Sequence, residues 1–167
     1  VLELALRDTP DTELVTWAQG KETWFRVSIP GNRTRIVRFA PDACFVLRQG
    51  SQVRHFFLEA DRSTEEHRRL VDKFVGYWRH LSNVRVAEHG QGRQRANVLV
   101  LMTDERRMMN VINTLRAIPK PKDASHSGKG TFWFATDRCV TVETPSRLLD
   151  SVWRSAAEGG GGLSIRP

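Results

Sequence analysis

The chain has 167 residues, a formal net charge of +7, no apolar run long enough to span a membrane and no signal-peptide pattern at its start. Its 40% hydrophobic and 27% charged content is ordinary for one globular domain with its own core. The excess of Lys and Arg favours a polyanionic partner, most simply nucleic acid, although ordinary surface solubility also accounts for a charge of this size. The two cysteines, Cys44 and Cys139, lack zinc-site spacing and suit a reducing cytoplasm.

The first half of the chain predicts two helical segments followed by strands. Apolar residues at helical spacing indicate a helix over residues 1–6 and a second one from Pro10 to a stop at Gly20. Alternating strand formers then predict a pair of strands over 24–29 and 34–39, followed by a hairpin over 42–59.

The second half predicts alternating helices and strands. We expect a helix from the capping box Ser63-Thr-Glu-Glu66 to about Leu81, and then a strand, buried on both faces, from Ala96 to Met102. The elements expected after it are a helix capped by Asp104, a basic loop over 119–129, a strand over 131–135, a helix over 145–156 and a flexible Gly-rich tail over 159–167. A mixed α/β sheet flanked by helices on both faces follows from this order, within a single domain over residues 1–158.

The hairpin over 42–59 brings two carboxylates together. If Gly50 and Ser51 form its two-residue turn, Gln49 faces Gln52, and the same count places Asp42 opposite Glu59. Two ionised carboxylates about 5 Å apart repel by about 3 kcal/mol at an effective dielectric of 20, so a shared proton, a basic side chain or a metal should compensate. A loop of three or five residues would instead shift the pairing and turn Asp42 to the opposite face.

Asp61 lies two residues beyond Glu59 and therefore on the same side of the strand. Three clustered carboxylates suit Mg²⁺ or Mn²⁺, with Asp42 and Glu59 as the expected ligands, and such ions support phosphodiester hydrolysis. Lys73, on the following helix, could point to Glu59 and stabilise developing charge, or could be a surface residue paired with an acidic neighbour. Tyr77 falls on the same helix face and is a further candidate, although a tyrosine there is more often a core-edge residue.

Several basic side chains are candidates for contacts with DNA phosphates. They lie around the second acidic strand and in the basic loop: Arg62, Arg69, Lys120, Lys122 and Lys129.

The order of Pro-Asp, hairpin, acidic strand end and helix resembles the PD-(D/E)XK nuclease-like fold. In that family an Asp precedes Asp/Glu-x-Lys, so Asp42 and Glu59 match the two acids, whereas Asp61 stands where the family has Lys. The resemblance implies a restriction-endonuclease-like core in which Lys73 has taken over the lysine role or nuclease activity has been lost. It also implies that Glu13, or alternatively Glu3, corresponds to the Glu of the family's preceding helix.

At a finer level the chain resembles the replication-relaxation family of bacterial mobile-element proteins. The resembling segments are PDACFVL from Pro41, FFLEADRSTE from Phe56, the Lys73 to Tyr77 spacing, TFWFAT from Thr131 and VWR from Val152. This resemblance implies a cytoplasmic bacterial protein, a winged-helix DNA-binding region ahead of residue 1 and a role in plasmid replication or DNA mobilisation. Double-stranded plasmid or mobile-element DNA is the implied partner, together with a second copy of the chain or other replication or mobilisation proteins.

Three interpretations of the acidic edge therefore stay open. The first is a Mg²⁺- or Mn²⁺-dependent DNA endonuclease or nicking enzyme. The second is a nuclease-like fold that binds DNA or protein without chemistry. The third is a structural cluster in which Arg62, Arg38 and Lys73 neutralise the acids.

Overall fold

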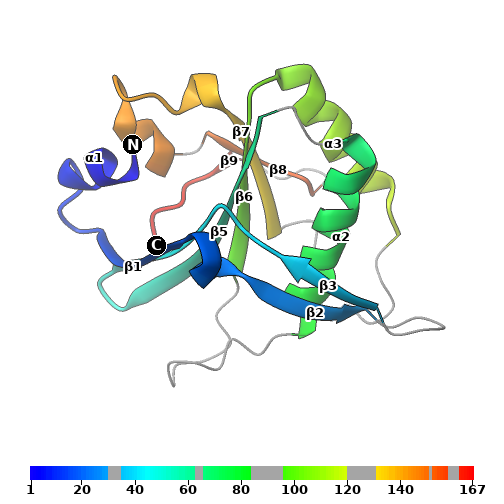
Figure 1. Ribbon diagram of the computed structural model, residues 1–167. Coiled ribbons are helices and arrows are strands. Elements are labelled where there is room, and N and C mark those ends of the chain that lie inside the picture. Colours follow the sequence, from blue (N-terminus) through cyan, green and yellow to red (C-terminus); the bar gives the residue numbers. More distant parts are fainter. Residues whose placement is uncertain (30–34, 63–65, 84–95, 120–130, 151, 158–161) are drawn as a thin grey trace.

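A central seven-stranded sheet organises the computed structural model, which describes residues 1–167 except 30–34, 63–65, 84–95, 120–130, 151 and 158–161 (Figure 1). The sheet order is β1-β4-β5-β6-β7-β8-β9. Its strands are β1 (Glu13–Gln19), β4 (Ala43–Gln49), β5 (Gln52–Asp61), β6 (Ala96–Met102), β7 (Phe132–Thr136), β8 (Trp153–Ser155) and β9 (Gly162–Leu163). A separate hairpin is made by β2 (Phe25–Ile29) and β3 (Arg35–Phe39).

The sheet changes direction at β5, which pairs antiparallel with β4 and parallel with β6. The parallel pairing continues from β6 to β7, and β8 and β9 return antiparallel. The predicted central mixed sheet flanked by helices is confirmed. Because β5, β6 and β7 run in the same direction, their carboxyl ends share one edge of the sheet, where β4 begins.

Helices cover the two faces of the sheet and define two cores. One face is covered by α2 (His67–Asn83) and α3 (Glu105–Ala117), while the other is covered by α1 (Leu2–Arg7), a 3₁₀ helix over Pro145–Leu149 and the C-terminal residues (Figure 1). On β6, Val98 and Val100 pack toward α2 and α3, whereas Leu99 joins the opposite core. This alternation explains why β6 is an uninterrupted apolar run: both of its faces are buried.

Most predicted elements are confirmed, with shifts of a residue or two at their ends, except that α2 begins at His67, just after the predicted capping box. The confirmed elements are α1, β2, β3, the β4–β5 hairpin, α2, β6, α3 and β7. The Asp104 cap of α3 is also confirmed, because its Oδ1 accepts a hydrogen bond from the Arg107 backbone N–H at 2.6 Å. The capping-box residues 63–65 and most of the predicted basic loop lie outside the described residues.

Two predicted helices are wrong. The segment expected to form a helix from Pro10 to Gly20 is strand β1, with a short 3₁₀ helix over Gly20–Thr23, because its β-branched and aromatic residues pair with β4 along the sheet edge. The helix expected over 145–156 is a 3₁₀ turn followed by β8, since this segment extends the sheet beyond β7.

The expected flexible tail over 159–167 needs a correction from residue 162 onward. Gly162 and Leu163 form β9 against β8, and Ile165 is fully buried in the core under α1. Among the helices that the structure describes, none is long and apolar enough to cross a membrane.

Candidate functional site

The β4–β5 hairpin has the predicted two-residue turn and register. Gly50 has φ +58°, the left-handed conformation that favours glycine, and Gln49 pairs with Gln52. The ladder continues to Ala43 and Leu58, and the Asp42 N–H then donates to the Leu58 carbonyl at 3.0 Å. The pairing ends there, one position short of the predicted pairing of Asp42 with Glu59, and Asp42 lies close enough for its charge to raise the pKa of Glu59.

Asp42 is exposed and is tied to the neighbouring strand by its side chain. Its Oδ2 accepts a hydrogen bond from the Ala60 N–H at 2.7 Å, so β5 itself orients this carboxylate. The backbone bond engages one of the two oxygens, and the exposed group keeps further acceptor capacity at the surface of the sheet edge.

Glu59 is buried, with 3% of its surface exposed, and α2 supplies two donors to it. Lys73 Nζ lies 2.5 Å from Glu59 Oε2, and the Tyr77 hydroxyl donates to Oε1. Lys73 and Tyr77 are four residues apart, so they share one face of the helix. The sequence analysis named both residues, and the structure brings both to Glu59.

Burial is the main cause of the raised pKa of Glu59. Lys73 opposes this shift through its charge and hydrogen bond, Tyr77 also opposes it, and the nearby charge of Asp42 raises the pKa further. The pKa of Tyr77 is raised as well, first by burial and then by Glu59. Tyr77 therefore acts as a neutral donor that fixes one oxygen of the carboxylate.

Aromatic rings surround Tyr77 and keep water from this side of Glu59. The Tyr77 ring centroid lies 5.2 Å from that of Phe39, 5.8 Å from that of Phe57 and 5.9 Å from that of Phe25. Phe25 and Phe39 come from β2 and β3, so the separate hairpin serves as a wall of the site. Gly76 permits this packing, because a Cβ at this position would lie 2.0 Å from Phe39 Cζ.

Asp61 has its own counter-charge. Arg107 holds it in a bidentate ion pair, with Nε to Oδ2 at 2.6 Å and Nη2 to Oδ1 at 3.2 Å. Arg107 lies in the first turn of α3, which Asp104 caps. Neither local spacing nor the motif search could find this pair, because 46 residues separate its members and the β5–α2–β6–α3 crossover brings them together.

Among the described residues, the other sequence-predicted side chains make no hydrogen bond or ion pair with Asp42 or Glu59. Glu13 does not lie on a helix as expected, since the segment forms β1, where Glu13 pairs with Arg48 at 2.9 Å. Arg69 is exposed and pairs with Glu66 at 3.7 Å. Arg62 is exposed just after β5, Glu3 lies on α1, and three basic candidates fall outside the described residues: Lys120, Lys122 and Lys129.

Few carboxylates at this edge of the sheet are placed to hold a divalent ion. Within the described ranges no group of three or more His, Cys, Asp or Glu side chains could hold a metal, so the expected three-carboxylate patch is not present as a cage. Asp42 and Glu59 remain as two neighbouring carboxylates at this edge of the sheet. Mg²⁺ binds readily through one or two carboxylates when water and substrate phosphate complete its shell, so these two residues fit such an ion.

A family model described as Replication-relaxation matches residues 1–100, which is more than half of the 167-residue chain. The chain belongs to the replication-relaxation family. The match includes the whole β4–β5 hairpin and α2, and hence Asp42, Glu59, Lys73 and Tyr77. It ends within β6, so α3 with Arg107 lies beyond it. No curated protein and no solved structure matches the chain.

Proposed function

We propose that this replication-relaxation protein acts on the DNA of a plasmid or mobile element through a metal-dependent centre made by Asp42, Glu59 and Lys73. The observation that carries the proposal is the 2.5 Å approach of Lys73 Nζ to Oε2 of Glu59, an acid whose pKa the nearby charge of Asp42 raises. A cation beside two neighbouring acids at one edge of the sheet is the arrangement that the PD-(D/E)XK resemblance requires when its strand lysine is missing. The reaction would be hydrolysis of a phosphodiester, as cleavage or nicking of double-stranded DNA.

In this proposal each side chain has a separate task. Asp42 and Glu59 would hold Mg²⁺ or Mn²⁺, which supplies water activation and charge stabilisation when bound. The half-buried ammonium of Lys73 would turn from Glu59 toward the phosphate and stabilise the charge that develops there. Tyr77 orients Glu59 through its hydroxyl, and the aromatic wall excludes water behind it.

A second candidate function is binding of DNA or a protein without chemistry. The observation that favours it is the complete neutralisation of the buried acids: both Glu59 oxygens accept hydrogen bonds from α2, and Arg107 engages both Asp61 oxygens. Such a cluster would stabilise a nuclease-like fold whose activity has been lost.

Cleavage of supercoiled plasmid separates the two candidates. With Mg²⁺ or Mn²⁺ the purified chain should convert plasmid to nicked or linear forms, and EDTA should stop the reaction. Asp42→Ala and Glu59→Gln should abolish it by removing the metal ligands, whereas Glu13→Gln, at an exposed carboxylate on β1, should retain it. The enzymatic proposal fails if no DNA form is cut and calorimetric titration shows no metal binding; DNA binding by that inactive chain would then support the second candidate.

A further inference from the structure

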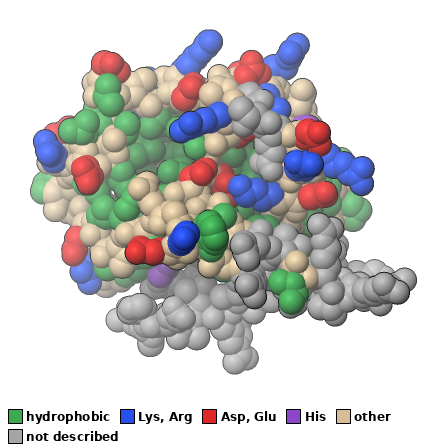
Figure 2. Space-filling model, viewed as in Figure 1, with side chains coloured by type: hydrophobic (Ala, Val, Ile, Leu, Met, Phe, Trp, Pro, Cys, Tyr) green, Lys and Arg blue, Asp and Glu red, His purple; other side chains and the backbone are tan. Residues whose placement is uncertain are grey.

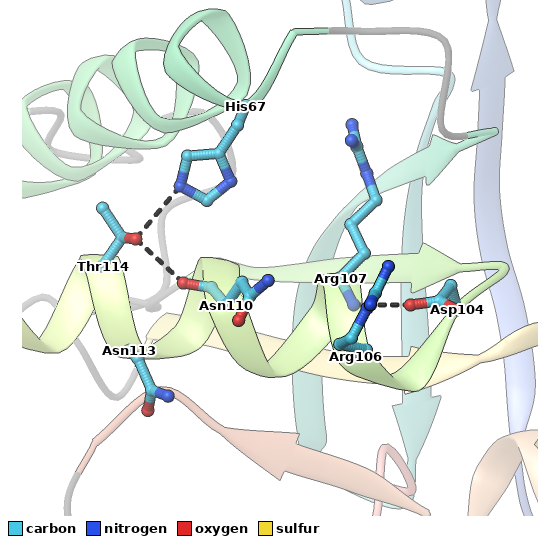
Figure 3. A pocket seen from close by; sticks show the side chains of 7 residues that line it. All are labelled: His67, Asp104, Arg106, Arg107, Asn110, Asn113 and Thr114. Carbon is cyan, nitrogen blue, oxygen red and sulfur yellow. Dashed lines mark hydrogen bonds between the residues drawn. The ribbon is translucent and has the colours of Figure 1, made fainter.

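A polar cavity of about 800 Å³ lies between the start of α2 and the exposed side of α3 (Figure 3). Its lining is entirely polar or charged: His67, Asp104, Arg106, Arg107, Asn110, Asn113 and Thr114. Arg106, Asn110 and Asn113 follow one another at i, i+4 and i+7, so they line one side of α3. One wall of the cavity is therefore a row of side-chain donors along α3, and His67 from α2 lies at its far end.

The walls of this cavity are held by internal contacts. His67 Nε2 lies 3.0 Å from Thr114 Oγ1, which in turn donates to the Asn110 carbonyl at 2.8 Å (Figure 3). Asp104 is engaged as the cap of α3, and Arg107 is engaged with Asp61. Both acids near the cavity are thus already compensated by protein groups.

The donors that remain have no protein partner in the described part of the chain. Neither the Arg106 guanidinium nor the side-chain amides of Asn110 and Asn113 make a hydrogen bond or ion pair with any residue that the structure describes. A guanidinium with two amides in line is suited to the oxygens of phosphate and sugar, the groups that most protein contacts to DNA engage. Arg107 lines the end of the cavity nearer the sheet, where its charge is paired with that of Asp61.

The cavity also adjoins the acidic sheet edge. Arg107 lines it and at the same time binds Asp61, which lies two residues beyond Glu59 and hence about 6.6 Å farther along β5. The face drawn in Figure 2 shows Lys and Arg side chains interspersed with acidic ones over the region of α2 and α3. A strand whose phosphate lay at Asp42 and Glu59 would reach the cavity by continuing past Asp61.

We infer that the α2–α3 cavity binds the sugar–phosphate backbone of a DNA strand, with Arg106 on a phosphate and Asn110 and Asn113 on neighbouring oxygens. This inference rests on the proposed DNA-acting role and adds to it the path of the strand beyond the acidic edge. It assigns to α3 a positioning task that does not depend on a bound metal.

Fluorescence anisotropy of labelled oligonucleotides in EDTA tests the inference without cleavage. A single strand and a duplex of equal length are titrated with the whole chain over a range of salt concentrations. For Arg106→Ala the slope of log K against log salt should decrease by about 0.9 for the duplex or about 0.7 for the single strand, since one phosphate contact is lost. Binding at low salt should weaken by roughly threefold or more, equally for different DNA sequences.

Two further variants sharpen the test. Asn110→Asp keeps the size of an exposed side chain but places a negative charge in the cavity, so it should weaken DNA binding at least as much as Arg106→Ala. Arg7→Ala removes the same charge from α1 on the opposite face of the sheet, and it should leave the affinity and the salt slope unchanged. Circular dichroism checks that each variant is folded.

The outcomes distinguish this inference from the proposed function. Loss of binding in the two cavity variants supports the inference even if the wild-type chain never cuts DNA. Wild-type affinity and salt slope in folded Arg106→Ala and Asn110→Asp overturn it, even if Asp42 and Glu59 prove essential for cleavage. Equal competition by a free nucleoside triphosphate at the same phosphate concentration would also overturn it, because the cavity would then accept a nucleotide and not a strand.

Discussion

Glu59 is a carboxylate whose surroundings both oppose and support its charge. Burial raises its pKa above the ordinary value of 4.5, and Lys73 provides the largest opposing effect. Breaking a buried ion pair by removing one partner is costly, because the remaining charge is left in a medium of low polarity. The protonation state of Glu59 therefore affects both the stability of the fold and any chemistry at this edge of the sheet.

We expect Glu59→Gln to change the pH dependence of stability. Folded Glu59 holds its proton more tightly than unfolded Glu59, so its contribution to the free energy of unfolding is fully present below pH 4.5 and is lost as the pH rises through the raised pKa. In Glu59→Gln this fall should be absent, whereas in Lys73→Met it should extend to higher pH, because the main influence that lowers the pKa is gone. Urea denaturation over a pH series from 4.5 upward measures the effect.

At neutral pH, Lys73→Met should also cost about 2 kcal/mol of stability, below the usual range for buried pairs because Lys73 is partly exposed and Tyr77 still donates to Glu59. Glu13→Gln is the matched control, since its ion pair with Arg48 is exposed and contributes little. Parallel pH profiles for the wild type and Glu59→Gln would contradict this account of Glu59.

At the level of elements, α2 does two things at once: it presents Lys73 and Tyr77 to Glu59 and it accepts the β2–β3 hairpin. The close contact of Phe39 with Gly76 joins these roles. Phe39 is 2% exposed and stacks on Phe25 at 5.4 Å, so its ring has little room to move.

Gly76→Ala should therefore destabilise the protein despite the better helix propensity of alanine. The propensity gain is about 1 kcal/mol, whereas overpacking of a buried ring costs about 1–3 kcal/mol, so a net loss of about 1 kcal/mol is expected. Chemical denaturation measures the change in the free energy of unfolding. The control is Asp72→Ala, at an exposed position of the same helix, where alanine changes helix propensity without overpacking the core. A more stable Gly76→Ala protein would show that the hairpin does not press on α2.

The sequence predicts those elements whose signal is local. The Gly50-Ser51 turn determines the register from Gln49–Gln52 to Ala43–Leu58, and the helical spacing of Lys73 and Tyr77 places them on one face. The prediction of a helix over Glu13–Gln19 is wrong because the apolar residues of this segment fit a helix or a strand. Only its pairing with β4 decides between the two. The Asp61–Arg107 pair could not be predicted, because it depends on how α3 packs after a crossover.

At the scale of the whole molecule, the C-terminal residues complete the core on the α1 face. Ile165 is fully buried there with Trp153 and Leu149, and its N–H donates to the Leu149 carbonyl at 3.2 Å. The expected mobile end is instead part of the fold, since β9 pairs with β8.

Ile165→Ala should accordingly lower the free energy of unfolding by about 2–5 kcal/mol, the range for deleting a large aliphatic side chain from a core. Val142→Ala, at a side chain that is 60% exposed, should change it by less than about 0.5 kcal/mol. Thermal and urea unfolding of the two variants provide the comparison. Equal stabilities would mean that residues 162–167 leave the core in solution.

The mixed direction of the sheet at β5 has a consequence for the order of folding. The β4–β5 hairpin is a local contact of a kind that closes in about 1–10 μs, whereas parallel pairing of β5 with β6 needs a long crossover and is slower. Asp42 and Glu59 are therefore expected to come together while only water and salt screen the repulsion between their charges. Lys73 reaches Glu59 later, when α2 packs against the sheet. Protonation or salt should then speed closure of the hairpin, so the two acids influence the rate at which the chain folds as well as the state it reaches.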